Sequence, residues 1–203
     1  MWTQPLAQLG DPSVYFDPRL NAQVAKIFPG QYFVTDRNIV LTTVLGSCVS
    51  ACIRDPAAGV GGMNHFLLPQ VPGDQGPASR CARYGTYAME VLINRLLRQG
   101  ARKQSMQAKV FGGGSVIPDL RTAGVGVSNA RFIVEYLAKE KIEVAAKDLL
   151  DDCARKVYFY PATGRVMVKK LRQLRNDTVL ARELDYGRQL MWADLSGSVE
   201  LFK

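Results

Sequence analysis

The sequence has a single histidine, His65, and no apolar run long enough to cross a bilayer. A transmembrane helix needs roughly 18 or more uninterrupted apolar residues, so we expect no membrane insertion. Residues 1–7 also lack the basic and apolar segments of a secretory signal, which favours a cytoplasmic location. In that reducing compartment, cysteines are expected to remain thiols rather than to form a disulfide framework.

The shortage of metal ligands argues against a zinc site. Besides His65, the sequence offers four cysteines, which are Cys48, Cys52, Cys81 and Cys153. Only the first two are close together, and their C-x3-C spacing is not the paired spacing of structural zinc sites. We therefore expect no metal and no other cofactor, and a reactive thiol becomes more plausible than a structural one.

The charge balance is basic, with 26 lysines and arginines against 18 acidic residues and a net charge of +8. Such a charge admits an acidic partner without choosing among nucleic acid, an anionic membrane and an acidic protein. The basic residues form two modest groups within 95–103 and 169–175, without the interleaved aromatic residues of single-strand binders. Solvated helix faces and strand ends explain these groups, so we expect no nucleic-acid partner.

Length and composition are typical of one globular domain, with 203 residues, 47% hydrophobic and 22% charged. A chain of this length buries roughly 70% of its unfolded surface and needs no disulfide or metal to build a core. Residues 1–28 are rich in turn-forming residues, which predicts an irregular N-terminal arm. We expect one α/β domain over 29–171 and a C-terminal extension over 172–203.

Local patterns predict a compact sandwich in which helices pack on a mixed, largely antiparallel sheet. Runs of β-branched and aromatic residues predict strands at 31–35, 38–43, 49–53, 63–68, 107–111, 142–146, 156–160 and 165–169. Helical periodicity predicts helices at 79–99 and at 128–139, the second with Ser128 as N-cap, and is weaker at 178–190. Residues 161–164 predict a hairpin turn.

A second hairpin would bring Cys48 and His65 together. If Arg54 pairs with Gly59 across the loop 55–58, the antiparallel ladder sets Cys48 directly opposite His65. Opposite side chains share a face with Cβ atoms roughly 4.5–5.5 Å apart, whereas a one-residue slip separates them. Because a cysteine that attacks an amide needs a neighbouring proton acceptor, this pair is the candidate nucleophile and base.

Amide hydrolysis also needs donors for the oxyanion and a group that orients the base. Gly46 and Ser47 form a sterically open turn before Cys48, where backbone N–H groups can face a developing oxyanion. Thr42 lies on the strand that leads into this turn, and its hydroxyl is a candidate to hold the imidazole.

Each of these features also has a simpler structural interpretation. A buried free cysteine is usually a small inert hydrophobe, as we interpret the other three cysteines, and His65 can be a satisfied core histidine. Gly112–Gly114 could cradle a phosphate, but the Walker lysine is missing and Ile117 replaces the third glycine of the dinucleotide fingerprint. A tight turn is the better interpretation of these glycines. The spacing of Cys48 and His65 alone indicates a cysteine hydrolase only as one option.

Two motifs resemble the chemoreceptor glutamine deamidase family, CheD. They are Leu45–Val49 around the cysteine and Gly61–Pro69 around the histidine, with further similarity at 83–89 and 108–113. The resemblance covers about residues 26–171. It implies an α/β sandwich with a papain-like cysteine and histidine arrangement, in which the nucleophile falls on Cys48, the histidine on His65 and the threonine on Thr42.

The resemblance also implies an activity and partners. The family hydrolyses glutamine side chains of methyl-accepting chemoreceptors to glutamate and ammonia. In this chain, the resemblance implies that the reaction passes through a thioester on Cys48. It also implies that receptor glutamyl methyl esters are cleaved. A CheC-type phosphatase is an implied second partner, so a non-catalytic adaptor of that phosphatase is the alternative function. The sequence departs from the family at 148–154, where glycines usually follow an aspartate, and at Gly114, where alanine is more typical.

Overall fold

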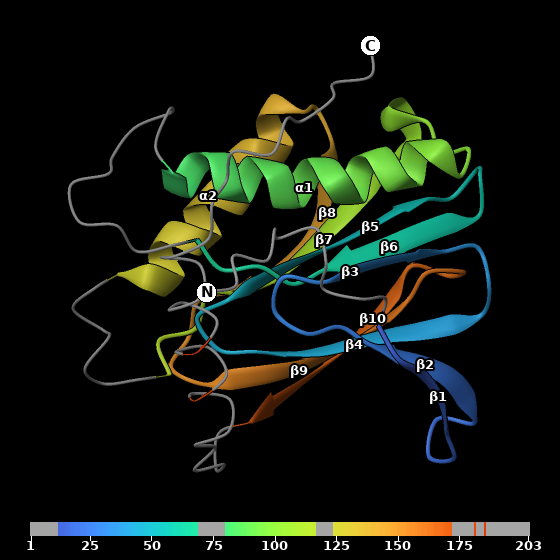
Figure 1. Ribbon diagram of the computed structural model, residues 1–203, viewed down its shortest axis with the longest axis horizontal. Helices are drawn as coiled ribbons and strands as arrows, with labels where there is room; N and C mark the ends of the chain where they lie inside the picture. Colours follow the sequence, from blue (N-terminus) through green and yellow to red (C-terminus); the bar gives the residue numbers. More distant parts are fainter. Residues whose placement is uncertain (1–11, 69–79, 117–123, 172–180, 182–184, 186–203) are drawn as a thin grey trace, which may run out of the picture.

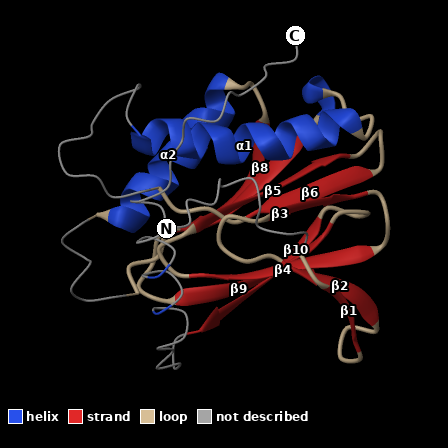
Figure 2. Ribbon diagram, in the orientation of Figure 1, coloured by secondary structure: helices blue, strands red, loops and turns tan. Residues whose placement is uncertain are grey.

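The computed structural model describes residues 12–68, 80–116 and 124–171, together with 181 and 185. Two five-stranded sheets lie face to face, and two helices cover the outer face of one of them (Figure 1, Figure 2). This arrangement confirms the predicted mixed α/β sandwich. The helical pattern at 178–190 falls almost entirely outside the described residues. No helix in the described ranges has the length and apolar character needed to span a membrane.

The first sheet has the strand order β1-β2-β4-β9-β10. Its strands are β1 (Val14–Asp17), β2 (Ala22–Lys26), β4 (Ile39–Leu45), β9 (Ala154–Tyr160) and β10 (Arg165–Leu171). Only β2 and β4 run parallel, and the β9–β10 hairpin closes at Tyr160 and Arg165 as predicted.

The predicted irregular arm is wrong for residues 14–26, which form β1 and β2. The side chains of β1 are exposed or only partly buried on both faces, so no alternation of apolar and polar residues marks it as a strand. Strand β1 forms because it pairs with β2, and β2 in turn pairs with β4. These pairings are not visible in the local sequence.

The second sheet has the order β3-β6-β5-β7-β8. Its strands are β3 (Tyr32–Thr35), β6 (Val60–Asn64), β5 (Val49–Asp55), β7 (Gln107–Gly112) and β8 (Glu143–Leu149), with a short 3-10 helix (Lys103–Ser105) before β7. Helix α1 (Arg80–Arg98) packs against β3, β5 and β6, and α2 (Val125–Lys139) packs against β5, β7 and β8. Strands β5 and β6 are therefore buried on both faces at nearly every position.

Helix α2 begins earlier than predicted. Gly124 is its N-cap residue with φ 61°, and the Ser128 N–H already donates to the Gly124 carbonyl at 2.9 Å. Ser128 therefore lies inside the helix, and its prediction as N-cap is wrong. A glycine in the left-handed region starts the helix where the sequence shows no capping side chain.

The hairpin between β5 and β6 is present, but its register differs from the predicted one. Asp55 pairs with Val60, so the loop runs from Pro56 to Gly59 and the predicted pair of Arg54 with Gly59 is wrong. The Asp55 carboxylate accepts hydrogen bonds from the N–H groups of residues 57 and 58, at 2.8 and 3.2 Å. Gly59 has φ 68°, which keeps it in the turn rather than in the strand.

Candidate active site

Cys48 and His65 belong to the face of the second sheet that turns toward the first sheet. Side chains alternate between the two faces along a strand. Arg54 reaches the first sheet, because its Nη2 donates to the Ala162 carbonyl at 3.1 Å between β9 and β10. Cys48 directly precedes β5, and continuing the alternation of that strand assigns its side chain to the same face. Asn64 points the opposite way and donates to a backbone carbonyl of α1 at 3.1 Å, so the next residue, His65, turns toward the first sheet.

The observed register makes these two residues diagonal neighbours rather than directly opposite ones. The bridge between Val49 and Phe66 places Leu67 opposite Cys48 when the register is extended by one residue. Diagonal neighbours typically lie about 7–8 Å apart between Cα atoms and remain within reach of longer side chains. Cys48 is 0% exposed and His65 is 3% exposed, so both side chains are buried.

A threonine orients the imidazole, and that threonine is Thr43. Its Oγ1 lies 2.8 Å from His65 Nδ1 and 2.7 Å from the Ile27 carbonyl oxygen. A hydroxyl has one hydrogen and a carbonyl only accepts, so Thr43 donates to Ile27 and accepts the N–H of Nδ1. This contact assigns the proton to Nδ1 and the lone pair to Nε2, and a general base needs such a lone pair.

The expectation that Thr42 holds the imidazole is wrong. The hydroxyl of Thr42 donates instead to the Val157 carbonyl of the neighbouring β9 at 2.8 Å. Thr43 shares its face of β4 with Leu41 and Leu45, which belong to the core. Every position of β4 is buried or half-buried, and both threonines are buried. No alternation of polar and apolar residues in the sequence therefore distinguishes the two threonines.

The Cys48 loop, Gly46–Cys48, is held by the glycine turn, Gly112–Gly114. The N–H of Gly113 donates to the Cys48 carbonyl at 2.8 Å, and the N–H of Gly114 donates to the Gly46 carbonyl at 2.7 Å. Gly112 has φ 112°, and a Cβ atom there would lie 2.1 Å from the Cys48 carbonyl oxygen. These amides serve the loop instead of a phosphate, in agreement with the predicted tight turn.

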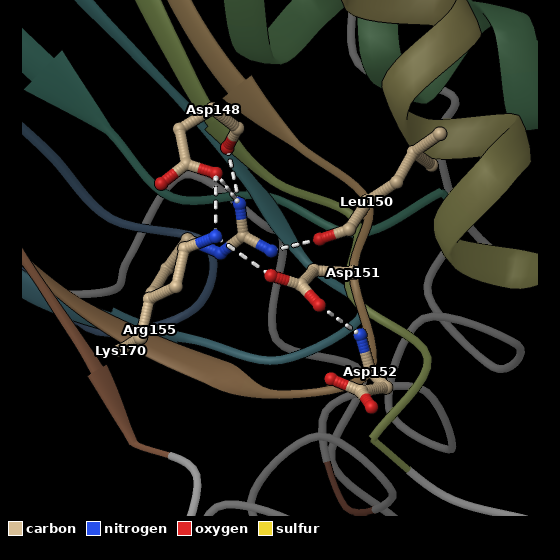
Figure 3. Close-up of polar contacts among 6 residues, drawn as sticks. All are labelled: Asp148, Leu150, Asp151, Asp152, Arg155 and Lys170. Carbon is tan, nitrogen blue, oxygen red and sulfur yellow. Dashed lines mark hydrogen bonds and ion pairs between the residues drawn. The ribbon is translucent and has the colours of Figure 1, made fainter.

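A buried arginine supports the glycine turn through the loop after β8. Arg155 on β9 is 0% exposed and donates to the Asp148 carboxylate at 2.7 Å, and to the backbone carbonyls of Asp148 and Leu150 (Figure 3). The N–H of Leu150 in turn donates to the Gly112 carbonyl at 2.8 Å. The first sheet is therefore linked to the Cys48 loop through two successive turns.

The loop at 148–154 keeps a backbone conformation that favours glycine although glycine is missing. Leu150 has φ 67° and Asp151 has φ 88°. The Asp151 carboxylate lies 2.7 Å from Lys170 Nζ on β10, and this ion pair lowers the pKa of Asp151 below its usual range (Figure 3). Ionic contacts thus accompany the strained turn at Leu150 and Asp151.

A hollow of about 180 Å³ opens beside Ser47. Its lining includes the backbone of Gly113 and Gly114 and the start of α2, and Val127 and Leu150 on the lining are exposed. The hollow therefore reaches the residue next to Cys48, between the glycine turn and α2.

Cys52 and Cys153 are the other cysteines whose side chains the structure describes, and both are buried. Burial raises the pKa of the Cys52 thiol far above its usual range, outweighing the lowering effects of Ser50 and Lys109. This agrees with the interpretation of Cys52 as an inert thiol. Cys153 is buried beside two aspartates, with ligand atoms within 4.8 Å of one another, but Lys170 already occupies the carboxylate of Asp151.

Comparisons with known proteins identify the relatives of this chain. A sequence model of the family described as CheD chemotactic sensory transduction matches residues 67–170, beginning two residues after His65. The chain is 52% identical over 200 residues to the probable chemoreceptor glutamine deamidase CheD of Methylobacillus flagellatus, covering 98% of each chain. It is 53% identical to the probable chemoreceptor glutamine deamidase CheD 1 of Dechloromonas aromatica, covering 93% of each.

Among solved structures, the chain is similar to a Neisseria meningitidis protein of the DUF152 family, with 11% identity and a TM-score of 0.37. That match covers 66% of this chain and 64% of the other. The sequence relatives are far closer, and their identity extends over nearly the whole length of both chains. This chain belongs to the CheD chemotactic sensory transduction family.

Proposed function

We propose that this protein is a cytoplasmic chemoreceptor glutamine deamidase, which hydrolyses glutamine side chains of methyl-accepting chemoreceptors to glutamate and ammonia. Relatives about half identical over nearly the full length carry that name. The observation that supports it best is the orientation of His65 by Thr43, which leaves the basic Nε2 nitrogen on a ring that shares its sheet face with Cys48.

In the proposed mechanism, His65 Nε2 takes the proton of the Cys48 thiol, and the thiolate attacks the carboxamide carbon. The tetrahedral intermediate collapses as His65 returns the proton to the departing nitrogen, which leaves as ammonia. Water then attacks the resulting thioester with His65 again as base, which releases glutamate and restores the thiol. A free thiol with a pKa near 8.5 is only a few per cent ionised at neutral pH, so the neighbouring base matters greatly.

Gly46 and Ser47 remain our candidates for oxyanion support. All three carbonyls of the Cys48 loop accept hydrogen bonds from outside it, from Gly114 at 2.7 Å, from Asn129 at 2.8 Å and from Gly113 at 2.8 Å. Fixed carbonyls also fix the direction of the loop's N–H groups before the reaction begins. Preorganised donors of this kind stabilise developing negative charge without a cost of reorganisation.

The substrate must gain access to a buried sulfur. Since Cys48 is fully buried, the receptor glutamine reaches it only when the surrounding chain opens, and the hollow beside Ser47 supports entry from that side. The same chemistry extends to receptor glutamyl methyl esters, with methanol leaving in place of ammonia. Docking to a CheC-type phosphatase is the alternative function, and it would not require the Cys48 sulfur.

Ammonia release from receptor cytoplasmic fragments tests the proposal. Cys48→Ala is expected to reduce release to the background rate, while binding to the receptor fragment persists. Cys52→Ala is the matched control, because it removes another buried thiol from the strand that follows and is expected to keep activity. Full activity in Cys48→Ala would overturn the proposal and favour the adaptor function.

A further inference from the structure

We infer that Asn129 is a positioning residue that joins the Cys48 loop to the segment after His65 and so sets how the two reacting side chains meet. The inference rests on the proposed function and concerns the same site. Asn129 lies on α2 and is 0% exposed. Its side chain forms hydrogen bonds to backbone groups of Ser47 and Leu68.

The carboxamide of Asn129 bridges the two segments. Its Nδ2 donates to the Ser47 carbonyl at 2.8 Å, and its Oδ1 accepts the N–H of Leu68 at 2.9 Å. Ser47 directly precedes Cys48, and Leu68 lies three residues after His65. A side-chain amide can donate and accept at the same time, whereas an ionised carboxylate only accepts.

The bridge occupies the place of a missing step in the β ladder. Val49 and Phe66 exchange both backbone hydrogen bonds, at 2.9 and 3.0 Å. In an antiparallel ladder the next hydrogen-bonded pair lies two residues further along each chain, which is Ser47 with Leu68. Instead of bonding directly, these two backbone groups bond to opposite ends of the Asn129 amide.

The inserted amide therefore separates the two chains beside Cys48 while keeping them connected. Direct pairing would close the strands at this step, and simple loss of pairing would leave the Ser47 carbonyl and the Leu68 N–H to find other partners. Helix α2 also packs closely against the glycine turn, where a Cβ on Gly113 would lie 2.7 Å from the Gly126 carbonyl oxygen. The helix thus positions the Cys48 loop by two separate contacts.

Alkylation of Cys48 by iodoacetamide, followed by peptide mass spectrometry over a range of pH, tests the inference without any receptor. In Asn129→Ala we expect the pH midpoint of alkylation to move toward that of His65→Ala, because the thiol loses its fixed relation to the imidazole. With receptor fragments, kcat should fall about tenfold or more while KM changes little, the loss expected for a misplaced reacting group. Asn129→Asp should behave similarly, since it keeps the size of the side chain but lacks the donor to Ser47.

Ile133→Val on the same helix is the matched control, since it shortens a buried side chain one turn away that cannot form a hydrogen bond to either segment. It is expected to lower thermal stability with an unchanged alkylation profile. Wild-type alkylation and wild-type kcat in a folded Asn129→Ala or Asn129→Asp variant would overturn the inference. If the Asn129 variants alter the alkylation profile but the wild-type protein releases no ammonia, the proposed function alone would be overturned.

Discussion

At His65, a hydroxyl takes the place that a carboxylate occupies in many hydrolytic triads. The Thr43 hydroxyl accepts a hydrogen bond from the Nδ1–H of the ring and donates one to the Ile27 carbonyl, so two linked hydrogen bonds hold the ring in one tautomer. A neutral hydroxyl stabilises an imidazolium less than an aspartate does. Its main contribution at this site is therefore orientation of the ring.

Thr43→Val should lower kcat for ammonia release by about tenfold or more, because the ring loses its orienting partner. The free energy of unfolding should also fall by about 1–3 kcal/mol, since buried polar groups lose a hydrogen bond. Thr42→Val is the matched control, with a similar stability loss at the Val157 carbonyl and little change in kcat. Steady-state kinetics and urea denaturation of both variants measure these effects, and the reverse order of kcat values would restore Thr42 as the orienting residue.

Asp55 gives the stability of the protein a dependence on acid pH. Burial alone would raise its pKa, but hydrogen bonds from Ser105, Arg102, Ala58 and Ala57 together lower it below its usual value. A carboxylate with a lowered folded pKa stabilises the fold above its unfolded pKa of about 3.9 and loses that contribution as the pH falls through the folded pKa. Stability should therefore decline below about pH 4.

Asp55→Asn should weaken this part of the acid dependence and reduce stability at pH 7. Urea midpoints at a series of pH values measure both effects. An Asp55→Asn variant with the same acid slope as the wild type would show that other carboxylates control the decline.

At the scale of elements, the glycine turn after β7 determines where the Cys48 loop can lie. The turn brings two N–H groups to carbonyls of that loop, and α2 packs on its other side. Such an approach of backbone to backbone leaves no space for a side chain.

Gly112→Ala should destabilise the protein by more than the roughly 1–2 kcal/mol that a left-handed alanine costs alone, and should abolish deamidation. Gly100→Ala is its matched control, because Gly100 has φ 92° with no atom within 4 Å of an added Cβ, whereas at Gly112 the Cys48 carbonyl lies 2.1 Å away. Thermal unfolding of both variants separates backbone strain from the close contact. Equal losses in the two variants would show that the contact is unimportant.

At the scale of the whole molecule, Arg155 connects the two sheets beside the glycine turn. It extends from β9 of the first sheet to the loop after β8 of the second sheet, and Lys170 on β10 adds an outer ion pair at 2.7 Å to Asp151 (Figure 3). The buried member of this cluster should matter far more than the exposed one. Removing the buried guanidinium takes a donor from the backbone carbonyls of Asp148 and Leu150.

Arg155→Met should lower the free energy of unfolding by about 2–3 kcal/mol, because a buried guanidinium loses hydrogen bonds to the partly exposed Asp148 carboxylate and to two backbone carbonyls. Lys170→Met, at a side chain 39% exposed, should cost far less than Arg155→Met, because surface ion pairs contribute little to stability. Chemical denaturation measures both losses. Similar losses in the two variants would contradict the division between a buried support and a surface contact.

Much of the fold could be predicted because its signals are local. The helical period at 80–98 and the β-branched runs of β4, β5, β7 and β9 depend on neighbouring residues only, and the structure has these elements close to their predicted bounds. Strand β1 was missed because its partly exposed residues lack alternation, and the start of α2 was missed because a left-handed glycine caps it. Both depend on pairing or backbone conformation that composition does not encode.

The sequence by itself determined the family, through the motifs around Cys48 and His65, and the shared face of those two residues, since a register shift of two residues preserves alternation. Only the tertiary structure decided which threonine meets the imidazole, because Thr43 and Ile27 come together across two strands. It also decided the β5–β6 register, through the Asp55 turn, and the bridging by Asn129, whose partners lie 82 and 61 residues away in the chain. Alternation and motif are properties of neighbours in sequence, whereas these contacts exist only after sheets and helices have packed.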